Sequence, residues 1–408
     1  MALFRKSEIV VASIILILAL CGAVSAISGD PGSNQPLIRF FIPEQGSIHS
    51  SQINGMINGH NGTDIFATSF GLSTYNGSWS TLHINRDNIS EGLLNDYITA
   101  VAYDSQGNLW IGYSGGVQIY NGVFYTTFRD QQLLKDPRIN ALQRWDDSMW
   151  VATGNAGLHR YRSGVWDWWQ PETPNGSPFY TVTGMAVDTS FQPNGSLIIA
   201  TADEGVWEIP VQNDPVQFLQ LPSGESFSDP LSQMTRDING GVYLFNHTTV
   251  VHYSDISGFS TLLTSSAFSE GKSSINAVTS ASDGSVYIGT DNGIYVWRNG
   301  GIEQRISGLD GLGPSNIVKF LFADNENRVW YATQGYVGFV QVSDLSATEI
   351  PIVVPTPVPS LTPGIVPSQQ IPALAETTPE SASPVSGIID PLIDAVKALF
   401  AKFGIQIG

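Results

Sequence analysis

The sequence predicts an all-β protein, a seven-bladed β-propeller of four-stranded antiparallel blades over residues 37–350. Three observations lead to this fold class. A repeat of roughly 44 residues occupies residues 51–342. Inside each repeat, apolar residues alternate with a period of two, and short turns rich in glycine and asparagine separate the alternating runs. Four short strands in each repeat, repeated seven times, are typical of a propeller.

The first segment, residues 1–26, is expected to be an export signal. A charged start precedes an apolar run from Ile9 to Leu20, and small residues precede a cleavage point after Ala26. An uncleaved N-terminal membrane anchor is the alternative, because about 20 apolar residues can span a bilayer. Lipid attachment at Cys21 is disfavoured, because Leu20 stands where such signals need a small residue. Each alternative predicts that the residues after this segment lie outside the cytoplasm.

Two series of residues mark the repeats that follow. An apolar residue opens the first strand of each repeat, and an aromatic or branched residue lies in the second strand. The opening residues are Ile53, Ile98, Ile139, Val182, Leu231, Ile275 and Ile317. The second-strand residues are Ile65, Trp110, Trp150, Ile198, Tyr243, Tyr287 and Trp330. We expect the second series to fill the space between blades rather than to form a ligand cage, because large aromatic side chains dominate cores.

The ring of blades is expected to close through the N-terminal part of the chain. The segment from Leu37 to Pro43 resembles the fourth strand of the repeats and precedes the first of them. It therefore predicts the missing fourth strand of the last blade, which would leave no exposed edge. The segment from Ile350 to Val354 is the rival for this place.

The C-terminal region changes composition twice. Residues 351–387 are rich in Pro, Ser and Thr, which predicts an extended, semi-rigid linker. Residues 388–408 predict a short amphipathic helix from Asp390 to Phe403, with a capping Asp-Pro start, an apolar stripe and Gly404 at its end. We expect this helix to contact a membrane surface or a partner protein.

Composition excludes several classes of function. The 408 residues carry a net charge of −18, which argues against nucleic-acid binding and against a polybasic contact with anionic lipid. The single cysteine, Cys21, lies in the N-terminal apolar run. A disulfide framework, a cysteine-based zinc site and a cysteine nucleophile are therefore all excluded.

One repeat carries a family resemblance. The unit runs Ile98-Thr-Ala-Val-Ala-Tyr-Asp104, then Gly107-Asn-Leu-Trp-Ile-Gly112, then Gly116-Val-Gln-Ile-Tyr-Asn-Gly122. This pattern resembles the two-component regulator propeller repeat, which builds extracytoplasmic sensor propellers ahead of histidine kinases. The sequence after residue 350 shows no pattern of a kinase or a transmembrane relay. The resemblance therefore implies a sensor-like or assembly module and does not extend to a signalling output.

The expected binding site is the mouth of the central channel, on the face that carries the fourth-to-first and second-to-third strand connections. Its unknown ligand is expected to be a protein or a carbohydrate. The candidate ligand-binding residues are the charged side chains of these connections: Arg86, Asp87, Arg129, Asp130, Arg138, Asp203, Glu204 and Asp291. Solvated loop charges are the ordinary alternative for all of them.

No catalytic or metal-binding spacing emerges among the histidines and carboxylates, so no catalytic residue, metal ligand or cofactor is expected. This favours a non-enzymatic binding module. The alternative is a propeller enzyme of the streptogramin-lyase or lactonase type, with a divalent cation held by carboxylates at the channel mouth.

The sequence also contains Asn-x-Ser/Thr sequons, which are candidate glycosylation sites if the host glycosylates its exported proteins. They begin at Asn61, Asn76, Asn88, Asn175, Asn194 and Asn246. Chance is the alternative, because turns rich in asparagine, glycine and serine produce such sequons without selection.

Overall fold

The computed structural model describes residues 37–342, except residues 45, 86–90, 124, 130–131, 175, 192–193, 222–230, 232 and 269–272. The chain divides into two units, 1–348 and 349–408, and the second lies wholly outside the described residues. The expected export signal, the linker, the helix from Asp390 to Phe403 and the rival closing segment therefore also lie outside them.

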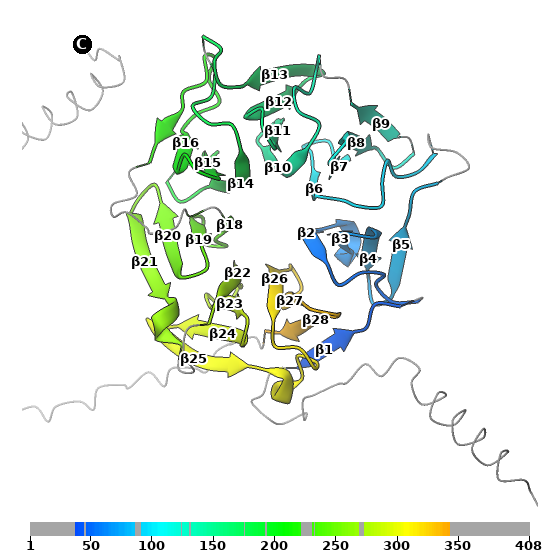
Figure 1. The fold of residues 1–408 in the computed structure, drawn as a ribbon, viewed down its shortest axis with the longest axis vertical. Helices are drawn as coiled ribbons and strands as arrows, with labels where there is room; N and C mark the ends of the chain where they lie inside the picture. Colours follow the sequence, from blue (N-terminus) through cyan, green and yellow to red (C-terminus); the bar gives the residue numbers. More distant parts are fainter. Residues whose placement is uncertain are drawn as a thin grey trace, which may run out of the picture. The chain divides into compact units, whose positions relative to one another are not determined.

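The described residues form seven four-stranded antiparallel sheets arranged around a common axis, as predicted (Figure 1). In each blade the first strand lies nearest the axis and the fourth lies at the rim. The blades, in chain order, are β2 (Ile53–Asn58), β3 (Asp64–Thr68), β4 (Gly71–Tyr75) and β5 (Trp79–Leu82); β6 (Ala100–Tyr103), β7 (Leu109–Tyr113), β8 (Gly116–Tyr120) and β9 (Tyr125–Phe128); β10 (Ile139–Trp145), β11 (Ser148–Thr153), β12 (Leu158–Arg162) and β13 (Val165–Trp169); β14 (Val182–Asp188), β15 (Ser196–Thr201), β16 (Val206–Ile209) and β17 (Leu219–Gln220); β18 (Gln233–Arg236), β19 (Val242–Phe245), β20 (Thr249–Ser254) and β21 (Gly258–Thr264); β22 (Ile275–Ser280), β23 (Val286–Thr290), β24 (Gly293–Arg298) and β25 (Gly301–Ile306); and β26 (Val318–Ala323), β27 (Arg328–Thr333), β28 (Tyr336–Gln341) and β1 (Ile38–Phe41).

The described connections also contain three short 3-10 helices, at His60–Gly62, Ser265–Ala267 and Gly308–Asp310. The antiparallel order defines two faces of the ring. We call the face with the fourth-to-first and second-to-third connections the loop face, and the face with the first-to-second and third-to-fourth connections the turn face. In the described part of the chain, no helix has the length and hydropathy needed to cross a membrane.

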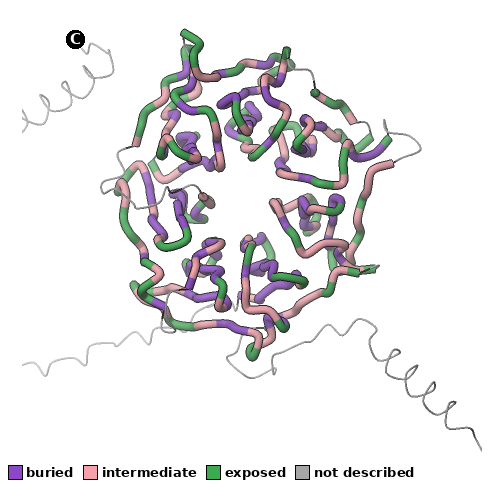
Figure 2. The backbone as a smooth tube through the Cα atoms, viewed as in Figure 1, coloured by how far each residue is buried: buried purple, intermediate pink, exposed green. Residues whose placement is uncertain are grey.

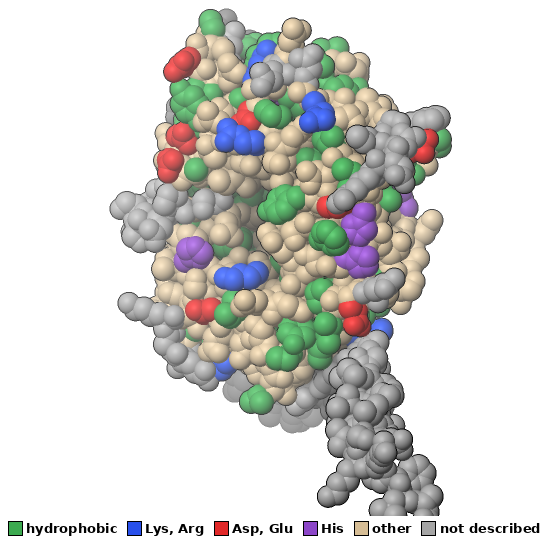
Figure 3. Space-filling view, turned by 45° about the vertical axis from the view of Figure 1, so that its right-hand side comes forward, with side chains coloured by type: hydrophobic (Ala, Val, Ile, Leu, Met, Phe, Trp, Pro, Cys, Tyr) green, Lys and Arg blue, Asp and Glu red, His purple; other side chains and the backbone are tan. Residues whose placement is uncertain are grey.

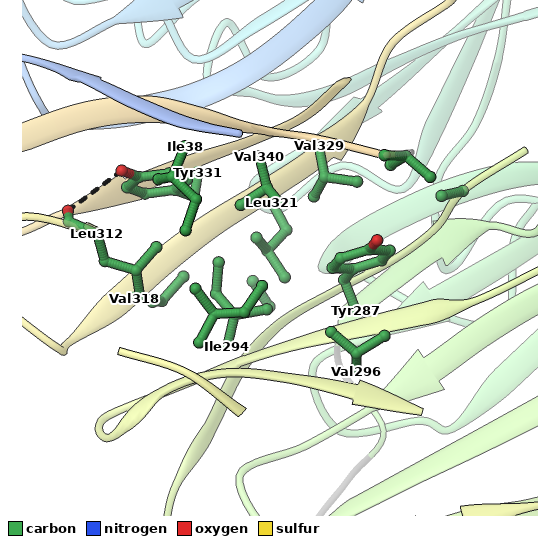
Figure 4. Close-up of a cluster of buried hydrophobic side chains, with 14 residues drawn as sticks. Ile38, Tyr287, Ile294, Val296, Leu312, Val318, Leu321, Val329, Tyr331 and Val340 are labelled. Carbon is green, nitrogen blue, oxygen red and sulfur yellow. Dashed lines mark hydrogen bonds between the residues drawn. The ribbon is translucent and has the colours of Figure 1, made fainter. Parts of the chain in front are cut away.

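The N-terminal strand closes the ring, as predicted. β1 pairs antiparallel with β28, so that Ile38 lies opposite Val340 and Phe41 lies opposite Val337. Figure 4 shows Ile38 in one buried cluster with Val340 and Tyr331, whose hydroxyl donates a hydrogen bond to the carbonyl of Leu312. β1 therefore completes the last blade as its fourth strand and covers the outer edge of β28.

An aspartate at the end of a first strand explains the Asp-x-x-Gly-Asn-x-Trp pattern of the repeat. Asp104 accepts hydrogen bonds from the backbone N–H of Gln106 and Asn108 and from the indole N–H of Trp110. Asp324 likewise accepts the N–H of Arg328 and the indole N–H of Trp330. One carboxylate thus holds a tight turn and orients the buried tryptophan.

The opening residue of the seventh repeat is Val318 rather than Ile317. Val318 pairs with Thr333, as Ile53 pairs with Thr68 in the first blade. Both candidates are β-branched and adjacent in sequence, so only the strand register distinguishes them. The register also shifts after the opening residue in five first strands.

The buried core lies mainly within and between neighbouring blades (Figure 2). Trp110, Trp150 and Trp330 are fully buried, and ring contacts join aromatic side chains across the blade interfaces. The aromatic series therefore packs between blades, as the sequence predicted.

Candidate functional site

The predicted site residues that the structure describes all lie on the loop face, in three separate connections. Arg129 and Arg138 flank the connection from β9 to β10, Asp203 and Glu204 lie between β15 and β16, and Asp291 lies between β23 and β24. Arg86, Asp87 and Asp130 lie outside the described residues.

Three of these loop-face residues, Arg138, Glu204 and Asp291, make local contacts. Arg138 binds Asp136 with two guanidinium nitrogens at 2.7–3.1 Å. Burial acts to raise the pKa of Asp136, but these hydrogen bonds hold it below its ordinary value. Asp291 accepts the N–H of Ser274, and Glu204 accepts the N–H of Tyr180. Across the ranges that the structure describes, no hydrogen bond or ion pair joins two of the predicted residues.

The space-filling view agrees with this distribution. On the surface shown in Figure 3, acidic and basic side chains are scattered among uncharged ones rather than gathered into one patch. The described candidate residues therefore do not form one charged patch that a small ligand could contact.

The sequons also occupy different environments. Asn61 and Asn76 are exposed on the turn face, and Asn194 is exposed beside the channel. Asn246 is buried in the turn before β20, where its Oδ1 accepts the N–H of Thr248 and Thr249. Asn88 and Asn175 lie outside the described residues.

The loop face carries a hydrogen-bonded chain that the sequence did not reveal. Nδ1 of His49 lies 2.8 Å from Nε2 of His83, and Nδ1 of His83 lies 3.3 Å from Oδ1 of Asp96. The two imidazole rings stack with centroids 5.0 Å apart. With neutral rings, His83 donates to Asp96 and accepts from His49, which fixes both ring orientations. The histidines are 34 positions apart in sequence, so no motif spacing could signal the pair.

The central channel contains two adjoining cavities. One, of about 450 Å³, is lined by the first strands of all seven blades, and small residues such as Gly55, Ala100 and Gly184 bring these strands near the axis. The other, of about 780 Å³, lies at the turn-face end. Gln143 and Arg236 are among the residues that line both, so the two cavities are neighbours along the channel.

The turn-face cavity concentrates basic side chains in an acidic protein. Its ionisable lining includes Arg144, Asp146 and Arg236. The guanidinium of Arg144 has no hydrogen-bond or ion-pair partner among the described residues, and that of Arg236 reaches only the hydroxyl of Thr189, at 3.4 Å. Lys319 adds a third basic group farther along the channel.

The remaining lining of this cavity is suited to a polar ligand. It includes the amides of Asn58, Gln143 and Asn194 and the rings of Tyr103 and Phe322. Amide groups donate and accept hydrogen bonds, and aromatic rings offer flat apolar surfaces. The cavity thus combines cationic, hydrogen-bonding and stacking groups.

The sequence did contain a signal for this site. Arg144 and Arg236 both stand five residues after the opening residue of their repeat, Ile139 and Leu231. At the same repeat position, the propeller geometry places side chains of different blades around one end of the channel. The charged loop residues that the sequence predicted as the site, where the structure describes them, lie on the opposite face of the ring.

Within the ranges that the structure describes, no group of three histidine, cysteine or acidic residues could hold a metal ion.

Comparison with known proteins supports the repeat and the fold. Residues 92–115 match the family described as Two component regulator propeller. The match covers one repeat unit, in the second blade. A comparison with curated proteins found no match.

Solved structures with the same architecture come from proteins of different function. The extracellular domain of the hybrid two component system BT4673 from B. thetaiotaomicron is 19% identical, with a TM-score of 0.56, over 75% of this chain and 40% of that one. Virginiamycin B lyase from Staphylococcus aureus is 11% identical, with a TM-score of 0.53, over 74% of this chain and 99% of that one.

A third structure is PorZ, a bacterial surface component of the type-IX secretion system of Porphyromonas gingivalis. It is 14% identical, with a TM-score of 0.54, over 72% of this chain and 47% of that one. At these identities the likeness concerns the fold alone. The chain spans about two fifths of the length of the two component system domain that it matches.

Proposed function

We propose that this chain is an extracytoplasmic, sensor-like binding module that holds a small anionic ligand at the turn-face end of its channel. The observation that carries the proposal is the pair of arginines, Arg144 and Arg236, in one cavity of about 780 Å³. Guanidinium groups without acidic partners favour carboxylate, sulfate or phosphate groups, which they bind through two parallel hydrogen bonds.

The class of ligand follows from the neighbouring side chains. The amides of Asn58 and Gln143 suit hydroxyl groups, and the rings of Tyr103 and Phe322 suit the apolar face of a sugar. An acidic sugar combines all three features. The channel would attract it although the whole chain carries a net charge of −18, because local charge decides binding at short range.

The extracytoplasmic location rests on the export signal expected at residues 1–26 and on the similarity of the propeller to extracellular domains. The expected linker at residues 351–387 would hold the propeller away from a surface. The helix expected from Asp390 to Phe403 would supply the attachment to a membrane or a partner.

The experiment is a thermal-shift and calorimetric titration of the full chain with glucuronate, using glucose as the matched neutral sugar. Saturating glucuronate should raise the melting temperature by about 2–5 °C, because a ligand at about 100 times its Kd contributes about 2.7 kcal/mol. Raising the ionic strength should weaken the binding.

The variant that tests the site combines Arg144→Gln with Arg236→Gln, which should abolish the shift. The matched control is Arg162→Gln, because Arg162 pairs with Asp147 outside both channel cavities. Equal binding of glucose and glucuronate, or unchanged glucuronate binding by the double variant, would refute the proposed site.

A further inference from the structure

At two blade interfaces, an indole from a second strand fills the space between neighbouring blades. In each case it packs against a cross-strand pair from the third and fourth strands of the next blade. The pairs are Tyr75 and Trp79 for Trp330, and Tyr161 and Trp166 for Trp110, with ring centroids 5.2–6.0 Å apart. Both indoles are fully buried. The repeat thus has a recurrent indole position facing the next blade.

The first blade lacks this indole, as do the fourth, fifth and sixth blades, which carry Ile198, Tyr243 and Tyr287 there. Ile65 stands at that position, facing the second blade, whose corresponding cross-strand pair is Tyr120 and Tyr125. The two tyrosine rings stack on each other, with centroids 4.6 Å apart and an interplanar angle of 25°. A branched aliphatic side chain is smaller than an indole, so the interface between these blades is left incompletely filled.

The structure contains a cavity of about 360 Å³ at this place. Ile65, Leu72 and Leu109 contribute to its apolar wall, and Tyr103, Tyr120 and Tyr125 contribute aromatic rings. His60 lies over Tyr103, with ring centroids 4.6 Å apart. The hydroxyl-bearing side chains of Thr74 and Ser80 also line the cavity, and Ser80 and Leu82 are solvent-exposed. The cavity is therefore an aromatic cleft with a polar margin that solvent reaches.

This cleft differs from the channel site. It lies between the first two blades, and among the described residues Tyr103 alone lines both it and the turn-face cavity. Arg144 and Arg236 do not line it.

Burial raises the pKa of both Tyr103 and Tyr125, so these phenols stay neutral at physiological pH.

We propose that the cleft between the first and second blades binds the planar aromatic ring of a small molecule, with the size of an indole or a phenol. Such a ring would take the place that Trp330 and Trp110 occupy at the other two interfaces. Aromatic rings prefer partners at centroid distances of about 4.5–7 Å, the spacing seen at those interfaces. A volume of about 360 Å³ lies at the small end of ligand pockets, which fits one ring system with a polar substituent.

The first test uses the unaltered full chain and two probes, indole and its non-aromatic size control cyclohexanol. Indole should bind saturably in ligand-observed NMR and should protect Tyr120 and Tyr125 from nitration, as measured by mass spectrometry. Cyclohexanol should do neither at the same concentration. Absence of indole binding, or binding without protection of these tyrosines, would overturn the proposal.

The second test uses variants that fill or preserve the cleft. Ile65→Trp restores the recurrent indole, and Ser80→Trp places an indole at the exposed margin, where the fold tolerates it more easily. Each should weaken indole binding at least tenfold, whereas Ile65→Val should retain it. Variants that fold and bind indole as tightly as the unaltered chain would contradict the proposal.

A last variant separates this site from the channel. The double variant Arg144→Gln and Arg236→Gln should bind indole unchanged, because neither arginine lines the cleft. Loss of indole binding in that variant would place the aromatic ligand in the channel instead.

Discussion

Removing one buried side chain from the closing strand measures how much β1 stabilises the ring. Ile38 is 1% exposed and lies in the buried cluster with Val340 and Tyr331. Ile38→Ala removes three carbon groups worth about 0.8 kcal/mol each and leaves a cavity, so the expected cost is about 3 kcal/mol.

The matching change in melting temperature follows from the size of the propeller. Unfolding entropy of about 2.1 cal/mol/K per residue over the roughly 300 residues of the propeller gives about 0.6 kcal/mol/K. A loss of about 3 kcal/mol should therefore lower the melting temperature by about 5 °C. Differential scanning calorimetry and urea unfolding of the full chain measure both quantities.

The same segment supplies the control. Ile42 follows β1 and is 46% exposed, so Ile42→Ala should change the stability by less than about 0.5 kcal/mol. Equal effects of the two substitutions would show that β1 is not docked against β28 in solution, and the account of ring closure would fail.

Two further predictions concern buried charge. Burial, and then the neighbouring Asp255, raise the pKa of Glu208 to about 7 from its ordinary value of 4.5. The unfolded chain loses this proton at lower pH than the folded chain, so this group should cost on the order of 2 kcal/mol of stability as the pH rises from 4.5 to 7. In urea unfolding, Glu208→Gln should make the pH slope shallower by this amount, while Asp64, whose pKa burial also raises to about 7, keeps its own contribution. Arg328 is buried between Asp64 and Asp324, and Arg328→Met should cost about 3–5 kcal/mol, because it leaves buried carboxylates without their cation.

Each of these has a matched control at the surface. Glu91 is exposed, so Glu91→Gln should leave the pH slope as it is in the unaltered chain. Arg162 forms an exposed ion pair with Asp147, so Arg162→Met should cost less than about 1 kcal/mol. A pH slope as steep in Glu208→Gln as in the unaltered chain, or an Arg328→Met variant as stable as Arg162→Met, would contradict the reasoning.

The sequence by itself determined the architecture of this protein. Strand alternation, turn residues and repeat length are local properties, and each recurs often enough to reveal the number of blades. The closing strand was also predictable, because the segment from Leu37 to Pro43 carries the pattern of a fourth strand ahead of the first repeat. The aspartate turns and the buried tryptophans follow from the same local pattern.

Only the tertiary structure decided which side chains share a site. The loop charges were predictable as exposed, but their separation around the ring depends on which blade carries each. Arg144 and Arg236 come together in one cavity, and His49 meets His83, because the ring brings together segments far apart in the chain. The cleft beside Ile65 lies where the first blade has a branched aliphatic side chain at the position at which Trp110 and Trp330 fill two other interfaces. The sequence shows that Ile65 stands at this position, but the cavity depends on how the first blade packs against the second.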